Sequence, residues 1–125
     1  MNNLFFYLCG GITFLWGVAH LFPTKSVVKG FGEISADNKN IIAMEWIVEG
    51  IALIFIGSVV VGVTLIDSKN NVSGFIYIAS AVVLLILAII SLFTGFKVNF
   101  LPFKLCPLMF SVSAALIIFG YLSQG

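Results

Sequence analysis

Two glutamates and one histidine are the residues of this sequence that, by type and spacing, could bind a ligand or transfer protons. Glu45 and Glu49 lie in an apolar segment long enough to cross a membrane, and a helix places residues four apart on one face. His20, the single histidine, lies three residues before Pro23, near the end of the first apolar segment. An imidazole beside two carboxylates could bind a cation, exchange protons or act as an acid–base pair.

The depth of the two glutamates suggests different states for them. A charged group at the bilayer centre costs about 2.5–3.5 kcal/mol on insertion scales, and two like charges one turn apart also repel. If the hydrocarbon edge is at Ile41, a rise of 1.5 Å per residue places Glu45 about 6 Å deep and Glu49 about 12 Å deep. We therefore expect Glu49 to be neutral and buried against the first helix, with Glu45 ionised beside His20. The alternatives are two solvated interfacial acids and a histidine that only packs or anchors.

The first apolar segment carries a stripe of semi-polar residues that includes His20. Cys9, Thr13, Trp16 and His20 follow one another at spacings of four, three and four, which one helical face accommodates. The predicted ligand-binding residues are His20, Glu45, Glu49, Trp16, Trp46 and Thr13. No catalytic residue is assigned.

Metal and cofactor chemistry have little support in these spacings. Di-metal sites in helix bundles combine glutamates with a Glu-x-x-His spacing on one helix. Here the acids are spaced Glu-x-x-x-Glu and the histidine is on another segment. Cys9 and Cys106 do not form a CxxC pair, so a thioredoxin-like or zinc-ribbon site is not indicated. We predict no metal site and no cofactor.

Composition identifies the class of protein. The 125 residues are 61% hydrophobic and 9% charged, with a mean hydropathy of +1.19. A soluble domain has about 45–50% apolar and about 25% charged residues, so an integral membrane protein is predicted. The net charge is only +1, from six lysines and five acids, which excludes the strongly basic footprint that nucleic acid needs as a partner.

The apolar segments predict an all-α fold. A spanning helix needs about 20 mostly apolar residues. Four segments qualify, over residues 4–22, 41–66, 74–96 and 106–122. Their short connections predict a single domain over residues 1–125, an antiparallel bundle of four transmembrane helices. The first connection places apolar residues at helical spacing between lysines, which predicts a short interfacial helix, and Ser35 is expected to cap the second span.

Lysine placement predicts the orientation in the membrane. Five of the six lysines, at positions 25, 29, 39, 97 and 104, lie in the first and third connections, and only Lys69 lies in the second. The positive-inside rule then puts both termini outside the cytoplasm, in a multi-pass protein of a bacterial inner (cell) membrane. The first segment has no basic residue before it, so we expect a permanent span rather than a cleaved signal.

Small residues predict how the first two spans pack. Gly10 and Gly17 are seven residues apart, as are Ala43, Gly50 and Gly57, and such seams let membrane helices approach closely. We expect packing within one chain, with a homodimer seam as the alternative. No predicted span contains an internal proline, which disfavours a transporter with broken helices.

Two stretches resemble a known family. "FLWGVAHLFP" (residues 14–23) and "MEWIVEGIALIFIG" (residues 44–57) are similar to the first and second spans of DoxX-like small membrane proteins. The resemblance covers about the first half of the chain. It implies a four-helix bundle, in some members a subunit of quinone-linked oxidoreductases.

Three functions follow from these observations. The main prediction is binding or transport of a lipophilic or cationic small molecule at a cytoplasm-facing intramembrane site made by the histidine and the two glutamates. The second is an accessory or structural subunit of a membrane complex. The third is an intramembrane enzyme that uses histidine–glutamate acid–base chemistry on a lipid, sterol-like or quinone substrate. The lipid bilayer is the expected partner, and a homodimer or a partner membrane subunit is left open.

Overall fold

The computed structural model describes residues 2–125, which form helices joined by short connections. These are α1 (Asn2–Leu21), α2 (Thr24–Gly30), α3 (Ala36–Asp67), α4 (Asn71–Phe93), the 3₁₀ helix η1 (Gly95–Lys97) and α5 (Leu101–Leu122). The described residues contain no strand, and α1, α3, α4 and α5 are long and apolar enough to cross a membrane. The predicted all-helical class with four candidate spans is confirmed.

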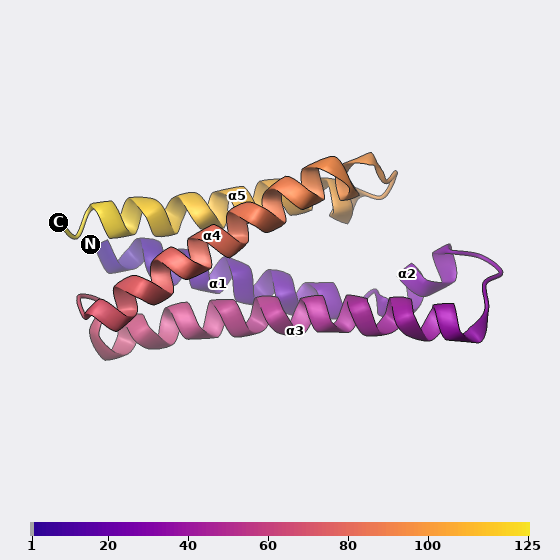
Figure 1. Cartoon of the computed structure of the whole chain (residues 1–125), viewed down its shortest axis with the longest axis horizontal. Helices are drawn as coiled ribbons and strands as arrows, with labels where there is room; N and C mark the ends of the chain where they lie inside the picture. The colour runs from indigo at the N-terminus through magenta and orange to yellow at the C-terminus, as the bar shows by residue number, and fades with distance from the viewer. Residues whose placement is uncertain (1) are drawn as a thin grey trace.

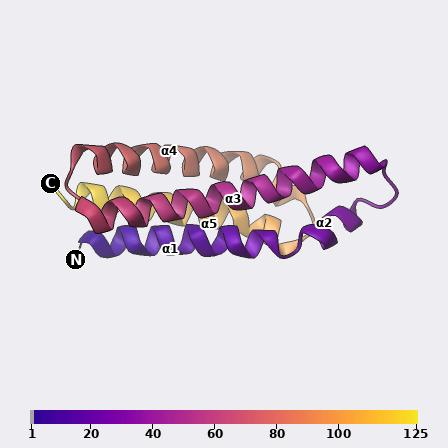
Figure 2. The same cartoon turned by 90° about the horizontal axis from the view of Figure 1, so that it is seen from below.

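The long helices lie alongside one another, and each runs back past the one before it (Figures 1 and 2). Both chain ends lie at one end of the molecule, while α2 and the first turns of α3 project beyond the other helices at the opposite end. With 32 residues, α3 is about 48 Å long, whereas the hydrocarbon core is about 30 Å thick. The polar start of α3, residues 36–40, therefore has room outside the hydrocarbon.

The helix α3 begins where the sequence predicts its N-cap. Ser35 precedes the helix, and its side-chain hydroxyl accepts a hydrogen bond from the backbone N–H of Asn38 at 3.1 Å. This bond satisfies one of the N–H groups that have no partner within the helix. The predicted N-cap is confirmed, and α3 begins before the apolar segment does.

The start of α5 was predicted five residues too late. The helix begins at Leu101 because Pro102, whose missing N–H is not needed in a first turn, suits that position. Pro107 consequently lies inside α5, so the prediction that no span contains an internal proline is wrong. Because proline has no N–H, the carbonyl of Phe103 cannot receive its usual helical hydrogen bond.

The glycines of α1 and α3 form one seam between these two helices. A Cβ added at Gly17 would lie 2.7 Å from the carbonyl oxygen of Gly50, and one added at Gly57 would lie 2.5 Å from that of Gly10. Both distances are too short for a real side chain, so the helix backbones are in contact. The predicted close packing within one chain is confirmed for these four glycines, whereas Ala43 lines a groove beside α2.

A buried polar contact joins the helices at the end near the termini. The hydroxyl of Thr64 donates to the carbonyl of Val60 at 2.6 Å and lies 2.8 Å from the hydroxyl of Tyr77. The Tyr77 ring stacks on Phe6, with ring centroids 3.8 Å apart. α1, α3 and α4 are therefore held together at this end, and the polar candidates lie at the other.

The orientation in the membrane stays a prediction. A reporter enzyme that is active only outside the cytoplasm should be active when fused after Gly125, because the lysine-rich end of the bundle is expected in the cytoplasm. The same reporter inserted between α4 and α5 should be inactive. The opposite pattern of activities would reverse the orientation and leave the helix arrangement unchanged.

Candidate functional site

The candidate site lies where the end of α1 meets α3. His20 is in the last turn of α1, three residues after Gly17. On α3, Trp46 and Glu49 are three residues apart and share one face, next to Gly50. Since Gly17 and Gly50 bring the two backbones into contact, His20 is held directly against Trp46 and Glu49.

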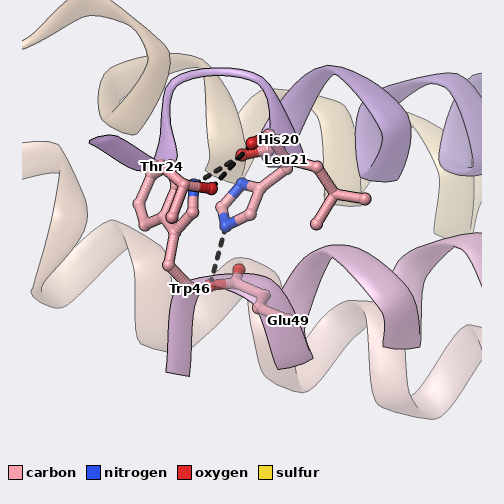
Figure 3. A network of polar contacts seen from close by, with 5 residues as sticks. All are labelled: His20, Leu21, Thr24, Trp46 and Glu49. Carbon is pink, nitrogen blue, oxygen red and sulfur yellow. Dashed lines mark hydrogen bonds and ion pairs between the residues drawn. The ribbon is translucent and has the colours of Figure 1, made fainter. Parts of the chain in front are cut away.

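The imidazole of His20 is buried between the two helices (Figure 3). Its ring stacks on the indole of Trp46, with centroids 3.8 Å apart and planes 15° from parallel. Its Nε2 atom lies 3.4 Å from Oε2 of Glu49, whose side chain is 41% exposed. This distance exceeds the usual 2.7–3.2 Å of an N–H···O hydrogen bond, and Nε2 makes no other hydrogen bond. The two groups therefore lie side by side without a hydrogen bond, they form an ion pair only when the imidazole is protonated, and the carboxylate stays open to a second partner.

Two side chains also fix the backbone at the end of α1 (Figure 3). The indole Nε1 of Trp46 donates to the carbonyl of His20 at 2.5 Å, and the hydroxyl of Thr24 donates to the carbonyl of Leu21 at 2.7 Å. The last carbonyls of a helix have no partner within it, so such bonds stabilise its end. Trp46 thus positions both the ring and the backbone of His20.

An aromatic cavity of about 200 Å³ adjoins the histidine. Its lining includes Trp16, His20, Trp46, Phe103 and Cys106, from α1, α3 and α5. The indole Nε1 of Trp16 is buried and makes no hydrogen bond of acceptable geometry, although Trp16 interacts with the thiol of Cys106. Sulfur is a weak acceptor, so this indole N–H can still donate to a better one.

An acidic groove of about 400 Å³ adjoins the aromatic cavity. It is lined by Phe31, the residue after α2, by Glu45 and Glu49, and by Trp46 and Phe103, which also line the aromatic cavity. The last two rings meet edge to face, with centroids 5.3 Å apart and planes at 63°. The two spaces therefore share one aromatic wall, with carboxylates on one side and apolar rings on the other.

The structure brings together five of the six predicted ligand-binding residues. His20, Trp16, Trp46, Glu45 and Glu49 line one or both of these adjoining spaces. The sixth, Thr13, is buried closer to the middle of α1, where its hydroxyl lies 3.9 Å from the Cys9 sulfur, and it lines neither space.

The expected partner of the histidine is wrong. His20 contacts Glu49, whereas Glu45 is exposed and makes no ion pair within the described residues. The physical reason is that Glu49 precedes Gly50, which faces α1, while Glu45 is one helical turn nearer the start of α3 and has an exposed side chain.

The predicted ligand-binding residues include none from α5. Phe103 completes the shared aromatic wall, and Cys106 closes the cavity beside Trp16. The signal was the stretch "FLPFKLC" (residues 100–106), in which aromatic residues flank a proline that suits the first turn of a helix. Among residues 2–125, no three His, Cys, Asp or Glu side chains lie close enough to hold a metal ion.

Comparison with known proteins finds no relative of this chain. No protein-family model, no curated protein and no solved structure matches the chain. The resemblance to DoxX-like proteins therefore stays a prediction that rests on residues 14–23 and 44–57, and the site must be interpreted from its own geometry.

Proposed function

We propose that this protein is an antiparallel four-helix membrane bundle that binds a lipophilic cation, with α2 lying at the membrane surface. The observation that carries the proposal is the wall made by Trp46 and Phe103, which lines both an apolar aromatic cavity and a groove with two carboxylates. In this proposal the positively charged group of the ligand lies in the groove and its apolar ring or chain reaches the cavity around the edge of the shared wall.

The chemistry of each space suits one part of such a ligand. A cation in the acidic groove is attracted by the carboxylates of Glu45 and Glu49, and the rings of Trp46 and Phe103 supply the apolar contact that a lipophilic cation also needs. The aromatic cavity, at about 200 Å³, is smaller than the roughly 300–1,000 Å³ of sites for drug-sized ligands. It therefore takes a single ring or a short chain, and Trp16 can donate one hydrogen bond to an oxygen on it.

His20 acts as a positioning residue in this proposal. Its Nε2 lies 3.4 Å from the carboxylate of Glu49, which also lines the groove, so a protonated imidazole would position that carboxylate from the buried side. A protonated imidazole neutralises Glu49, and a bound cation does the same from the groove. Proton and cation therefore compete for one carboxylate, which is the arrangement that proton-linked exchange requires.

Tryptophan fluorescence tests the proposal directly, because both tryptophans of the chain line the site. Protein in zwitterionic nanodiscs is titrated with benzyltrimethylammonium and, in parallel, with its neutral isostere neopentylbenzene. We expect a saturable change in emission with the cation and a much weaker change with the isostere, because only the cation is attracted by the carboxylates. Equal responses to both compounds, or no saturable response to the cation, would contradict the proposal.

A further inference from the structure

We propose that a basic groove between α2 and the start of α3 binds the phosphate headgroup of an anionic phospholipid. The groove has a volume of about 590 Å³, and its polar lining consists of Thr24, Lys25, Lys29, Glu33, Lys39 and Asn40. It shares no lining residue with the aromatic cavity or the acidic groove. The proposed lipid site is therefore separate from the cation site and does not depend on it.

The charges of the basic groove are unbalanced. Three lysines and one glutamate line it, which leaves a formal charge of +2. Within residues 2–125 the one contact at ion-pair distance joins His20 and Glu49, so none of the three lysines is in contact with a carboxylate, Glu33 included. Lysines that line one groove with an excess of positive charge repel one another, and an anion bound among them reduces that repulsion. Lysine ammonium groups and the amide of Asn40 supply the hydrogen-bond donors that phosphate oxygens accept.

The location of the basic groove favours a lipid as the source of the phosphate. α2 and the first turns of α3 project beyond the bundle at the end away from the termini, where a long α3 leaves the hydrocarbon (Figure 1). The groove also has apolar lining, from Val28 and Ala43, and exposed Phe31 and Ile41 lie beside it along the chain. A headgroup bound by the lysines can therefore extend its acyl chains along the apolar part of α3, and basic residues beside a span attract anionic lipids.

Native mass spectrometry tests the proposed lipid site. The detergent-solubilised protein is offered equal amounts of phosphatidylglycerol and phosphatidylcholine, and the retained lipids are counted. We expect the wild type to retain phosphatidylglycerol preferentially. The variant Lys29→Gln/Lys39→Gln, which changes one exposed lysine on each wall of the groove, should retain it about tenfold less or worse, because each lysine near the surface contributes to anionic lipid binding.

A control variant of equal charge separates the basic groove from general electrostatic attraction. Lys69→Gln/Lys97→Gln removes the same charge from two exposed lysines outside the groove and should retain phosphatidylglycerol within about twofold of wild type, since local contacts are unchanged. Equal losses in the two variants would overturn the proposal, as would equal retention of the two lipids by the wild type. Displacement of the lipid by millimolar inorganic phosphate would also overturn it, because the ligand would then be a soluble phosphate.

The benzyltrimethylammonium titration distinguishes this site from the cation site. The Lys29→Gln/Lys39→Gln variant should give the wild-type fluorescence titration, because neither lysine lines the aromatic cavity or the acidic groove. If this variant loses the lipid preference and still gives the wild-type cation titration, the lipid site is supported, whether or not the wild type binds the cation. A wild-type lipid preference in this variant overturns the lipid site alone.

Discussion

Gly57→Leu should separate α1 from α3 and destabilise the protein by about 3 kcal/mol or more, at the upper end of what overpacking costs. A Cβ at this position would lie 2.5 Å from the carbonyl oxygen of Gly10 and 2.6 Å from the backbone N of Phe14. Backbone atoms of a helix cannot rotate away as a side chain can, so the helices themselves must move apart. The measurement is the melting temperature of the purified protein in detergent, followed by helical circular dichroism.

Gly62→Leu is the matched control for this prediction. Gly62 is on the same helix, but no atom lies within 4 Å of a Cβ added there. Leucine has a higher helix propensity than glycine by roughly 0.8 kcal/mol, so this variant should melt at or slightly above the wild-type temperature. An unshifted melting temperature for Gly57→Leu would show that the glycine seam is absent from the folded protein. Equal losses in both variants would point to a cost of leucine that is unrelated to the seam.

The fold was predictable to the extent that its signals are local. Long apolar runs gave the four candidate spans, the hydroxyl of Ser35 gave the start of α3, and glycines seven residues apart gave the seam. Each of these signals lies within one continuous segment of the sequence. The contribution of α5 was not predictable in this way, because sequence spacing does not say which helices become neighbours.

The partner of His20 shows the limit of reasoning from depth alone. Glu45 and Glu49 differ by four residues, which is about 40° around an α-helix with 3.6 residues per turn. They therefore share one face and differ mainly by about 6 Å along the helix axis, so the axial register of α3 against α1 decides which carboxylate meets the imidazole. The contact between Gly17 and Gly50 sets that register and places Glu49, the residue before Gly50, beside His20. Depth counted along α3 alone does not give this register.

Glu49→Gln should weaken binding of benzyltrimethylammonium about 10–100-fold, because a quaternary ammonium about 5 Å from a carboxylate is attracted by about 3 kcal/mol at an effective dielectric constant of about 20, part of which desolvation offsets. Glutamine has nearly the same shape as glutamate, and the side chain is 41% exposed, so the fold should be retained with an unchanged melting temperature. The loss should come from the missing negative charge of Glu49, which lines the acidic groove and lies beside the buried His20. The measurement is the tryptophan fluorescence titration in zwitterionic nanodiscs.

Glu45→Gln is the matched variant on the same face of α3, and it should weaken binding by at most about fivefold. Glu45 is exposed and does not contact His20, and interactions of exposed charges contribute about 0.2–1 kcal/mol. Both variants lose one negative charge from the same groove. The decisive result is therefore which of them weakens cation binding more. A larger effect of Glu45→Gln would place the cation near α2, away from the histidine. If neither variant changes the titration, both carboxylates are solvated residues at the membrane surface, and the cation-binding function is refuted.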